Sequence, residues 1–254
     1  SFSSANVGVG ITITSNYSIS GSAAANYTLT QPTGITANIT AKPLTITADN
    51  VSGTYGTSVS LGSTAYSQTG LVSGDNISGV TLSYGGANTV AATVGAGTYS
   101  GAILASSALG SGLSNYAITY VAGNLTIAQA TLTLTPTAKS VNYSGTTLNT
   151  ATYSADTANY SITGYKNSDS ASNVLLSFTG SLSFTQGGSA ATVRNAGTYA
   201  YAAGTLAITS TNSNYQVVLA NTLSNTYVIN PVTVTLSASK TYDGSAIFAS
   251  SNSA

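Results

Sequence analysis

The sequence predicts an all-β, or mostly β, fold in which small β-sandwich-like or β-grasp-like modules follow one another in an elongated rod. Val, Ile, Thr and Tyr dominate most stretches, and Gly, Asn and Ser interrupt them, which is typical of strands and turns. Short segments alternate apolar residues with Thr, and helical periodicity is almost absent. Several motifs also recur at long, similar intervals, which indicates repeated modules.

The first element of each module is a strand in which apolar residues alternate with Thr. The segments are "LTIT" at Leu44–Thr47, "LTLT" at Leu132–Thr135 and "VTVT" at Val232–Thr235, and they start 88 and then 100 residues apart. Successive strand side chains point to opposite faces, so the apolar residues share one face and the hydroxyls share the other. We expect three half-buried strands.

A Tyr-Gly corner and a Gly-to-Asp turn follow the first strand. Tyr55, Tyr143 and Tyr242 come 11, 11 and 10 residues after its start, and a Gly lies one or two positions beyond each. Further on, "GLVSGD" at Gly70–Asp75 matches "GYKNSD" at Gly164–Asp169 with the same spacing from Gly to Asp. Gly and Asp at these positions predict turns.

The back half of each module contains the word "AGTY" and an Asn-Tyr pair. "AGTY" occurs at Ala96–Tyr99 and again at Ala196–Tyr199. "VGVGIT" at Val7–Thr12 resembles "VGAGTY" around the first of these words, which sets Gly10 opposite Gly97. We expect each Asn-Tyr pair to open a strand, 16, 18 and 17 residues after the corresponding Gly, at Asn26, Asn115 and Asn214.

These landmarks divide the chain into two complete modules and two partial ones. We expect residues 1–41 to be the back half of a module, residues 42–129 and 130–230 to be complete, and residues 231–254 to be the front of another. No Gly/Ser linker lies at any joint, and Pro43 and Pro231 favour an extended entry. Short joints of this kind predict a semi-rigid rod.

The two partial modules together hold fewer residues than one complete module. A module assembled from the tail of one molecule and the head of another would therefore lack several strands. We expect this chain to be an excerpt of a longer polypeptide whose neighbouring modules are covalently joined to it, rather than one that exchanges strands with other molecules.

The composition argues against most catalytic chemistry. His, Cys, Met and Trp are absent, the five acidic residues are all Asp, and the net charge is zero. Without His or Cys there is no ordinary general base near neutral pH and no soft metal site, so we expect no enzyme, catalytic residue, cofactor or metal. The five basic residues are scattered, which predicts no nucleic-acid partner. No apolar run is long enough for a membrane helix, so we expect no membrane insertion in this segment.

Three stretches resemble the MBG and YDG modules, which are stalk repeats of very large bacterial surface proteins such as filamentous-haemagglutinin-like exoproteins and biofilm adhesins. They are Asn26–Thr47, Val51–Gly56 and Ser239–Ala246, together with the "AGTY" words and the Asn-Tyr pairs. By this resemblance the two end segments are YDG-like, residues 42–129 are MBG-like and residues 130–230 are a divergent MBG-like module. The resemblance implies a secreted or cell-surface location in a bacterium and an extracellular stalk or matrix role, without a catalytic site.

Repeated tyrosines and aspartates are the main candidates for a site. The tyrosines could form a sugar-stacking platform, but their recurrence in each module favours packing inside the modules; they are Tyr55, Tyr99, Tyr116, Tyr143, Tyr199 and Tyr215. Asp75 and Asp169 could bind calcium, but no second acid lies near either one, so a turn-capping role is favoured.

Other recurring residues have structural interpretations. Gly97 and Gly197 predict turns or close backbone approaches, and Tyr242-Asp243-Gly244 predicts a turn. The recurring lysines are either edge-strand residues that oppose aggregation or solvated surface, at Lys42, Lys139 and Lys240. Asn-X-Ser/Thr sequences, whose glycosylation is left open, occur at Asn16, Asn26, Asn38, Asn50, Asn76, Asn124, Asn142 and Asn159.

The function that fits these features best is a structural stalk segment of a large cell-surface or biofilm-matrix adhesin. Its partners would be the neighbouring modules of the same chain. The alternative is a glycan-binding module that uses the repeated tyrosines on a surface or matrix polysaccharide. An enzyme ranks third. Functional amyloid ranks last, because the long repeat and the frequent Gly oppose the stacking of identical short strands.

Overall fold

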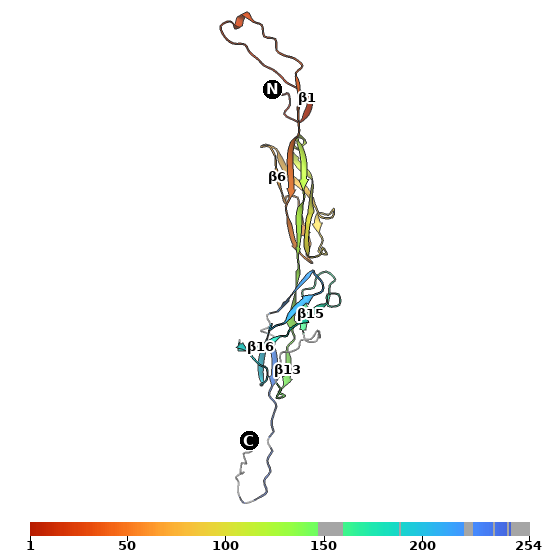
Figure 1. Ribbon diagram of the computed structural model, residues 1–254, viewed down its shortest axis with the longest axis vertical. Coiled ribbons are helices and arrows are strands. Elements are labelled where there is room, and N and C mark those ends of the chain that lie inside the picture. The colour runs from red at the N-terminus through yellow and green to blue at the C-terminus, as the bar shows by residue number, and fades with distance from the viewer. Residues whose placement is uncertain (147–159, 188, 221–225, 236, 243, 245–254) are drawn as a thin grey trace. The chain divides into compact units, whose positions relative to one another are not determined.

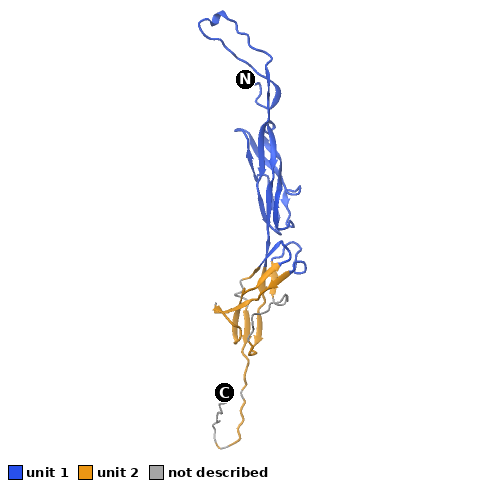
Figure 2. Cartoon of the chain, viewed as in Figure 1, with its two compact units in different colours: residues 1–132, 164–175, 210–217 blue, residues 133–163, 176–209, 218–254 orange. Residues whose placement is uncertain are grey.

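A computed structural model describes residues 1–146, 160–187, 189–220, 226–235, 237–242 and 244 (Figure 1). Its regular structure is almost entirely β strand, and the only helical elements in these ranges are two three-residue 3-10 turns, η1 (Ala24–Asn26) and η2 (Leu113–Asn115). The all-β class is therefore confirmed. The chain divides into two compact units, which Figure 2 colours separately: residues 1–132, 164–175 and 210–217, and residues 133–163, 176–209 and 218–254.

Two sheets enclose the core of the first unit. One has the order β10-β3-β6 and the other has the order β4-β11-β9-β7. Their strands are β3 (Lys42–Ala48), β4 (Val51–Thr54), β6 (Tyr66–Thr69), β7 (Asn76–Ser83), β9 (Gly97–Ser111), β10 (Tyr116–Val121) and β11 (Gly123–Ala128). Two short strands, β5 (Val59–Ser60) and β8 (Thr89–Val90), pair beside them. No α-helix lies among the described residues, so the arrangement is sandwich-like rather than β-grasp-like.

The alternating pattern of the sequence builds this core. In β3 the apolar residues Leu44 and Ile46 are buried, while the intervening Thr45 and Thr47 are only partly covered. Leu82, Ile103 and Leu125 of the other sheet are also buried. The strand predicted from "LTIT" is thus the central strand of its sheet, parallel to β10 and antiparallel to β6.

The same pairing rules recur in residues 130–230. These residues form a sheet of order β14-β12-β20, a sheet of order β13-β21-β18-β16-β17 and the pair β15-β19. Their bounds are β12 (Ala130–Pro136), β13 (Lys139–Asn142), β14 (Tyr160–Thr163), β15 (Leu176–Thr179), β16 (Ser183–Gln186), β17 (Ser189–Ala190), β18 (Gly197–Ala202), β19 (Ala207–Ser210), β20 (Tyr215–Leu219) and β21 (Thr226–Asn230). Strand β13 is parallel to β21, as β4 is parallel to β11.

The register of the last strands corrects one alignment made from the sequence. Gly97 pairs with Ile127, Gly197 pairs with Ile229, and Gly8 of β1 (Gly8–Thr12) pairs with Ile39 of β2 (Thr36–Ile39). Gly8, and not Gly10, is therefore the counterpart of Gly97. The error arose because glycines alternate in both "VGVG" and "VGAG", so the two words also match when they are shifted by two residues.

Two predicted strands do not form. Val232–Thr235 has no strand structure, and no strand follows Tyr27 until β2 begins at Thr36. Their counterparts, β3 and β10, pair with each other, and β3 also pairs with β6. A strand-like sequence without such a partner leaves its backbone groups to solvent, so it stays extended without forming a sheet. The predicted turn at Tyr242-Asp243-Gly244 and the glycosylation sequence at Asn159 include residues outside the described ranges.

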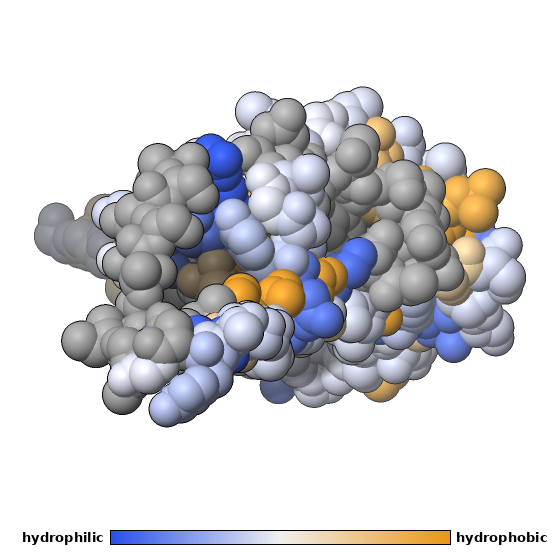
Figure 3. All heavy atoms as spheres, turned by 90° about the horizontal axis from the view of Figure 1, so that it is seen from below, coloured by the Kyte–Doolittle hydropathy of each residue, from blue (hydrophilic) through white to orange (hydrophobic). Residues whose placement is uncertain are grey.

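The expectation for the recurring lysines has a mixed outcome. Lys139 begins β13, an edge strand, whereas Lys42 begins the central strand β3, so the edge-strand interpretation fits only the first. On the face in Figure 3, most coloured residues are pale and hydrophobic ones form small, separate groups. Residues of hydropathy near zero, such as Ser and Thr, give these pale colours.

Candidate functional site

Two tyrosines and one aspartate form a cluster inside the first unit. The hydroxyl of Tyr215 donates a hydrogen bond to Oδ2 of Asp169 at 2.7 Å, and the hydroxyl of Tyr55 donates to the same oxygen at 2.9 Å. The two rings meet edge to face, with centroids 5.4 Å apart and an interplanar angle of 84°. Such a contact is favourable because the positive edge of one ring faces the negative face of the other. Both tyrosines are buried.

The Tyr55-Gly56 corner places one phenol in this cluster. It follows β4 directly, and the Tyr55 N–H donates to the carbonyl oxygen of Ala128 at 2.9 Å. Gly56 has φ +86°, and a Cβ there would lie 2.4 Å from the side chain of Lys166. Only glycine combines this backbone conformation with so close an approach. The corner therefore fits against the segment that carries Asp169.

The Gly164–Asp169 turn positions the carboxylate. Gly164 has φ +105°, and a Cβ there would lie 2.3 Å from the carbonyl oxygen of Thr131. The turn closes when the Asp169 N–H donates to the carbonyl oxygen of Lys166 at 3.0 Å. The sequence predicted a turn here, but the carboxylate's main partners are phenols distant in sequence. The recurrence of Tyr and Asp in matching positions was the available signal, although spacing alone could not pair them.

The Asn-Tyr pair joins the same region from another side. Oδ1 of Asn214 accepts a hydrogen bond from the Ala96 N–H at 2.7 Å. The Asn-Tyr pair at Asn214 therefore contacts the first "AGTY" word, which belongs to the preceding module. The Ala130 N–H donates to the carbonyl oxygen of Asn214 at 2.9 Å. Gln129, the only residue between β11 and β12, donates through Nε2 to the carbonyl oxygen of Ser213 at 2.8 Å.

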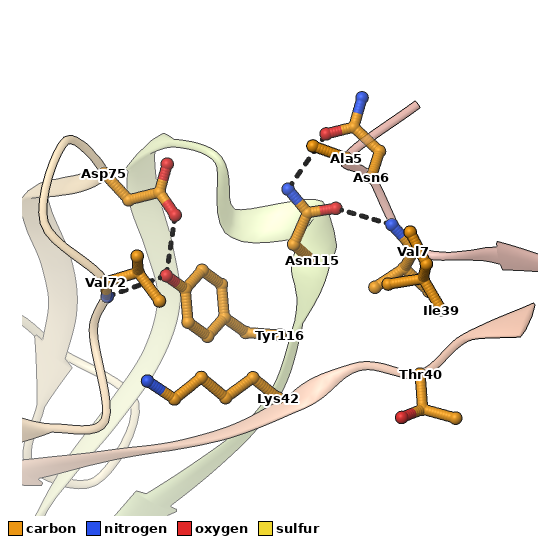
Figure 4. A pocket seen from close by; sticks show the side chains of 10 residues that line it. All are labelled: Ala5, Asn6, Val7, Ile39, Thr40, Lys42, Val72, Asp75, Asn115 and Tyr116. Carbon is orange, nitrogen blue, oxygen red and sulfur yellow. Dashed lines mark hydrogen bonds between the residues drawn. The ribbon is translucent and has the colours of Figure 1, made fainter. Parts of the chain in front are cut away.

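An equivalent arrangement surrounds Asp75 and Tyr116 (Figure 4). The Tyr116 hydroxyl donates to Oδ2 of Asp75 at 2.6 Å and accepts from the Val72 N–H at 2.9 Å. The Tyr215 hydroxyl likewise accepts from the Lys166 N–H at 2.9 Å. Val72, Asp75 and Tyr116 line a cavity of about 360 Å³, together with Ala5, Asn6, Val7, Ile39, Thr40, Lys42 and Asn115.

The remaining contacts of this second arrangement match those of the first. Oδ1 of Asn115 accepts from the Val7 N–H at 2.9 Å, as Asn214 accepts from Ala96. Gly70 has φ +111°, and a Cβ there would lie 2.5 Å from the carbonyl oxygen of Pro43, as at Gly164. The two sites therefore have the same arrangement. In each, a glycine with positive φ lies against the backbone of the first strand, and an aspartate accepts a hydrogen bond from a tyrosine hydroxyl.

Both tyrosine hydroxyls are held in the neutral form. Burial, followed by the hydrogen bond to Asp169, raises the pKa of Tyr215 to about 12. The hydrogen bond to Asp75, followed by burial, raises the pKa of Tyr116 above its ordinary value. A neutral phenol donates to a carboxylate, whereas a phenolate would repel it. Near neutral pH each hydroxyl therefore holds its aspartate turn in place through a hydrogen bond.

The other three predicted tyrosines differ in burial. Tyr199 is buried and its hydroxyl donates to the carbonyl oxygen of Asn195 at 2.9 Å; Tyr99 makes the same bond to Gly95 but is only half-buried. Tyr143 is 41% exposed. Packing inside the modules is therefore correct for Tyr55, Tyr116, Tyr199 and Tyr215, and incomplete for Tyr99. It is wrong for Tyr143, which lies on the surface.

Residues 44–126 match the family model of the MBG domain (YGX type). This segment is an MBG-type repeat. The match contains the Tyr55-Gly56 corner, the Gly70–Asp75 turn and the first "AGTY" word, so the MBG resemblance is confirmed for these residues. The MBG domain indicates an extracellular, adhesin-like module. The YDG-like assignments of residues 1–41 and 231–254, and the divergent MBG-like assignment of residues 130–230, stay predictions.

The other comparisons add no further relative. No curated protein and no solved structure matches the chain. Across the residues that the structure describes, no helix has the length and apolar character needed to span a membrane, and no three His, Cys, Asp or Glu side chains lie together as metal ligands.

Proposed function

We propose that this chain is a structural stalk segment of a large bacterial cell-surface or biofilm-matrix adhesin. Its role is to give reach, stiffness and resistance to proteases, and its partners are neighbouring modules of the same polypeptide. The MBG-type repeat at residues 44–126 supports this proposal. The observation that carries it is the shared use of Asp169 by Tyr55 and Tyr215.

The cluster matters because it lies beside the passage from β11 to β12. One residue, Gln129, separates these strands, and its side chain is hydrogen-bonded. Tyr55, which follows β4, is tied to Asp169 of the later turn. Bending or twisting the chain at Gln129 would strain the hydrogen bonds from Gln129 to Ser213 and from Tyr55 to Asp169, the second of which is partly buried and therefore costly to break. A joint that resists bending in this way suits a stalk that must stay extended.

The glycan-binding alternative depends on accessible tyrosine rings. Tyr116, Tyr199 and Tyr215 are buried, and their hydroxyls already have protein partners. A sugar stacks on an exposed aromatic face, so these rings are poorly placed to bind one. The stalk is therefore preferred.

Limited proteolysis and a glycan array test the proposal together. A protease that cleaves after apolar residues should leave residues 123–136, the passage from β11 to β12, uncut, and the full chain should bind no glycan above background. Rapid cleavage next to Gln129 would contradict the stalk, because it would show that the joint opens. Saturable binding of a polysaccharide would favour the alternative.

A further inference from the structure

We propose that the cavity beside Asp75 and Tyr116 is a socket for a tyrosine side chain. Its occupant is an extended segment that ends in a Tyr-Gly corner and belongs to another module of this type. The inference extends the proposed stalk function and rests on it, because it names the contact by which the first unit receives a neighbouring module.

The Asp169 site shows what a filled socket contains. Oδ2 of Asp169 accepts hydrogen bonds from two phenols, one from Tyr215 beside the turn and one from the Tyr55 corner. At Asp75, within the described residues, the same oxygen accepts from Tyr116 alone. An ionised carboxylate oxygen can accept more than one hydrogen bond. Asp75 therefore has room for a second phenol in the place where Asp169 holds Tyr55.

The backbone beside the cavity offers the second half of the site. The Tyr55 N–H donates to the carbonyl oxygen of Ala128, and the Tyr143 N–H donates to that of Asn230, at 2.9 Å in both cases. These acceptors directly follow Ile127 and Ile229, which pair with Gly97 and Gly197. Each corner tyrosine is thus anchored one residue beyond the isoleucine that pairs with glycine.

The counterpart of these acceptors is Thr40. It directly follows Ile39, which pairs with Gly8, and it lines the cavity (Figure 4). On its other edge β2 has no partner among the described strands, whereas β11 and β21 each pair there with a parallel strand that leads to a corner tyrosine. An open strand edge accepts an added strand through main-chain hydrogen bonds. A segment parallel to β2 would deliver its tyrosine to Thr40 and Asp75 together.

The walls of the cavity suit a phenol. Ile39, Val72 and Tyr116 supply apolar surface, and Asp75 supplies the acceptor. Val72 stands where the filled site has Lys166, the residue that lies against Gly56. A sugar could use the acceptor but not the strand edge. The combination of an acceptor, apolar walls and an unpaired edge points to a strand with a terminal tyrosine.

The test adds a peptide with the sequence of residues 50–57, NVSGTYGT, to the full 254-residue chain and follows backbone amide shifts by NMR. We expect saturable shifts at Thr40, Val72, Asp75 and Tyr116. Replacing the peptide tyrosine with Ala should abolish them. Replacing it with Phe should weaken binding about tenfold, because only the hydrogen bond to the carboxylate is lost.

A pair of matched variants locates the binding. D75N should remove most of the difference between the Tyr and Phe peptides, whereas D169N, at the filled socket, should leave that difference unchanged. Because the peptide variants do not alter the folded chain, their comparison stays informative if either protein variant is destabilised.

Two outcomes would overturn the socket. One is the absence of shifts at about 5 mM peptide, a concentration comparable to that which a short tether provides. The other is equal binding of the Ala and Tyr peptides, which would indicate strand addition without a tyrosine site. Neither result bears on the proteolysis of the joint at Gln129, so failure of the socket and failure of the stalk are distinguishable.

Discussion

The hydroxyl of Tyr55 donates a 2.9 Å hydrogen bond to the carboxylate of Asp169, a residue 114 positions later in the chain. Tyr215 donates to the same oxygen and packs its ring against that of Tyr55. A contact of this range cannot form until both segments are folded. It therefore couples the Tyr-Gly corner after β4 to the turn at residues 164–169, and the stability of each should depend on the other.

A double-mutant cycle measures this coupling. Y55F removes one phenol, and D169N removes the charge of the acceptor. We expect a coupling free energy of about 1–2 kcal/mol from urea unfolding, since hydrogen bonds to charged groups are stronger than neutral ones. Y143F, at an exposed tyrosine, is the matched control and should change stability by less than about 0.5 kcal/mol. Additive effects of Y55F and D169N would show that the contact contributes nothing.

Stability should fall at high pH because of Tyr215. Its pKa is raised to about 12 in the folded chain, against an ordinary value of 10.0. Below pH 10 the phenol is protonated in both states, so its contribution is fully present. Between pH 10 and 12 the unfolded chain loses the proton first, and about 2–3 kcal/mol of stability should disappear.

Urea unfolding of the wild type and of Y215F at several pH values between 8 and 12 isolates this contribution from that of the other tyrosines. The difference between the two proteins should be constant below pH 10 and should shrink above it. A difference that does not change with pH would contradict the raised pKa.

Two equivalent tyrosines should respond differently to truncation. Tyr199 is 2% exposed, so Y199A should cost about 3–5 kcal/mol through lost burial and the cavity left behind. Tyr99 is only half-buried, and Y99A should cost about half as much. Thermal unfolding compares the two. Equal losses would mean that the surroundings of Tyr99 close over its ring in solution.

The glycine of the Gly-to-Asp turn should resist substitution. G164A combines a positive φ with a Cβ that would lie 2.3 Å from the carbonyl oxygen of Thr131, so we expect a loss of about 2–4 kcal/mol. G85A is the matched control, because Gly85 also has positive φ but open space around it. It should cost only about 1 kcal/mol. Similar losses at both sites would show that the turn moves away from Thr131.

Local pattern predicted much of this fold. Alternation of apolar residues with Thr located β3 and β12, and the recurrence of "AGTY" located the starts of β9 and β18. These features depend on neighbours in the chain, which a sequence displays. The pattern failed at Val232–Thr235, where strand formation depends on partners elsewhere in the chain.

The site was predicted less completely. Asp75 and Asp169 were expected to cap turns, and each does close a turn through its backbone N–H. Their hydrogen bonds to Tyr116, Tyr215 and Tyr55 depend on which loops the strands bring together. That placement follows from parallel pairs such as β3 with β10 and β4 with β11, whose strands are far apart in the sequence. The half-burial of Tyr99 and the exposure of Tyr143 depend in the same way on distant surroundings.

Small-angle scattering of the full chain tests the stalk most directly. The short joints expected from the sequence, with the hydrogen-bonded joint at Gln129 as the example, predict a strongly elongated particle. A compact globule of this length would have a radius of gyration of roughly 18 Å. We predict a value about twice as large or more, and a distance distribution with a long tail. A radius of gyration near that of the compact globule would contradict the account.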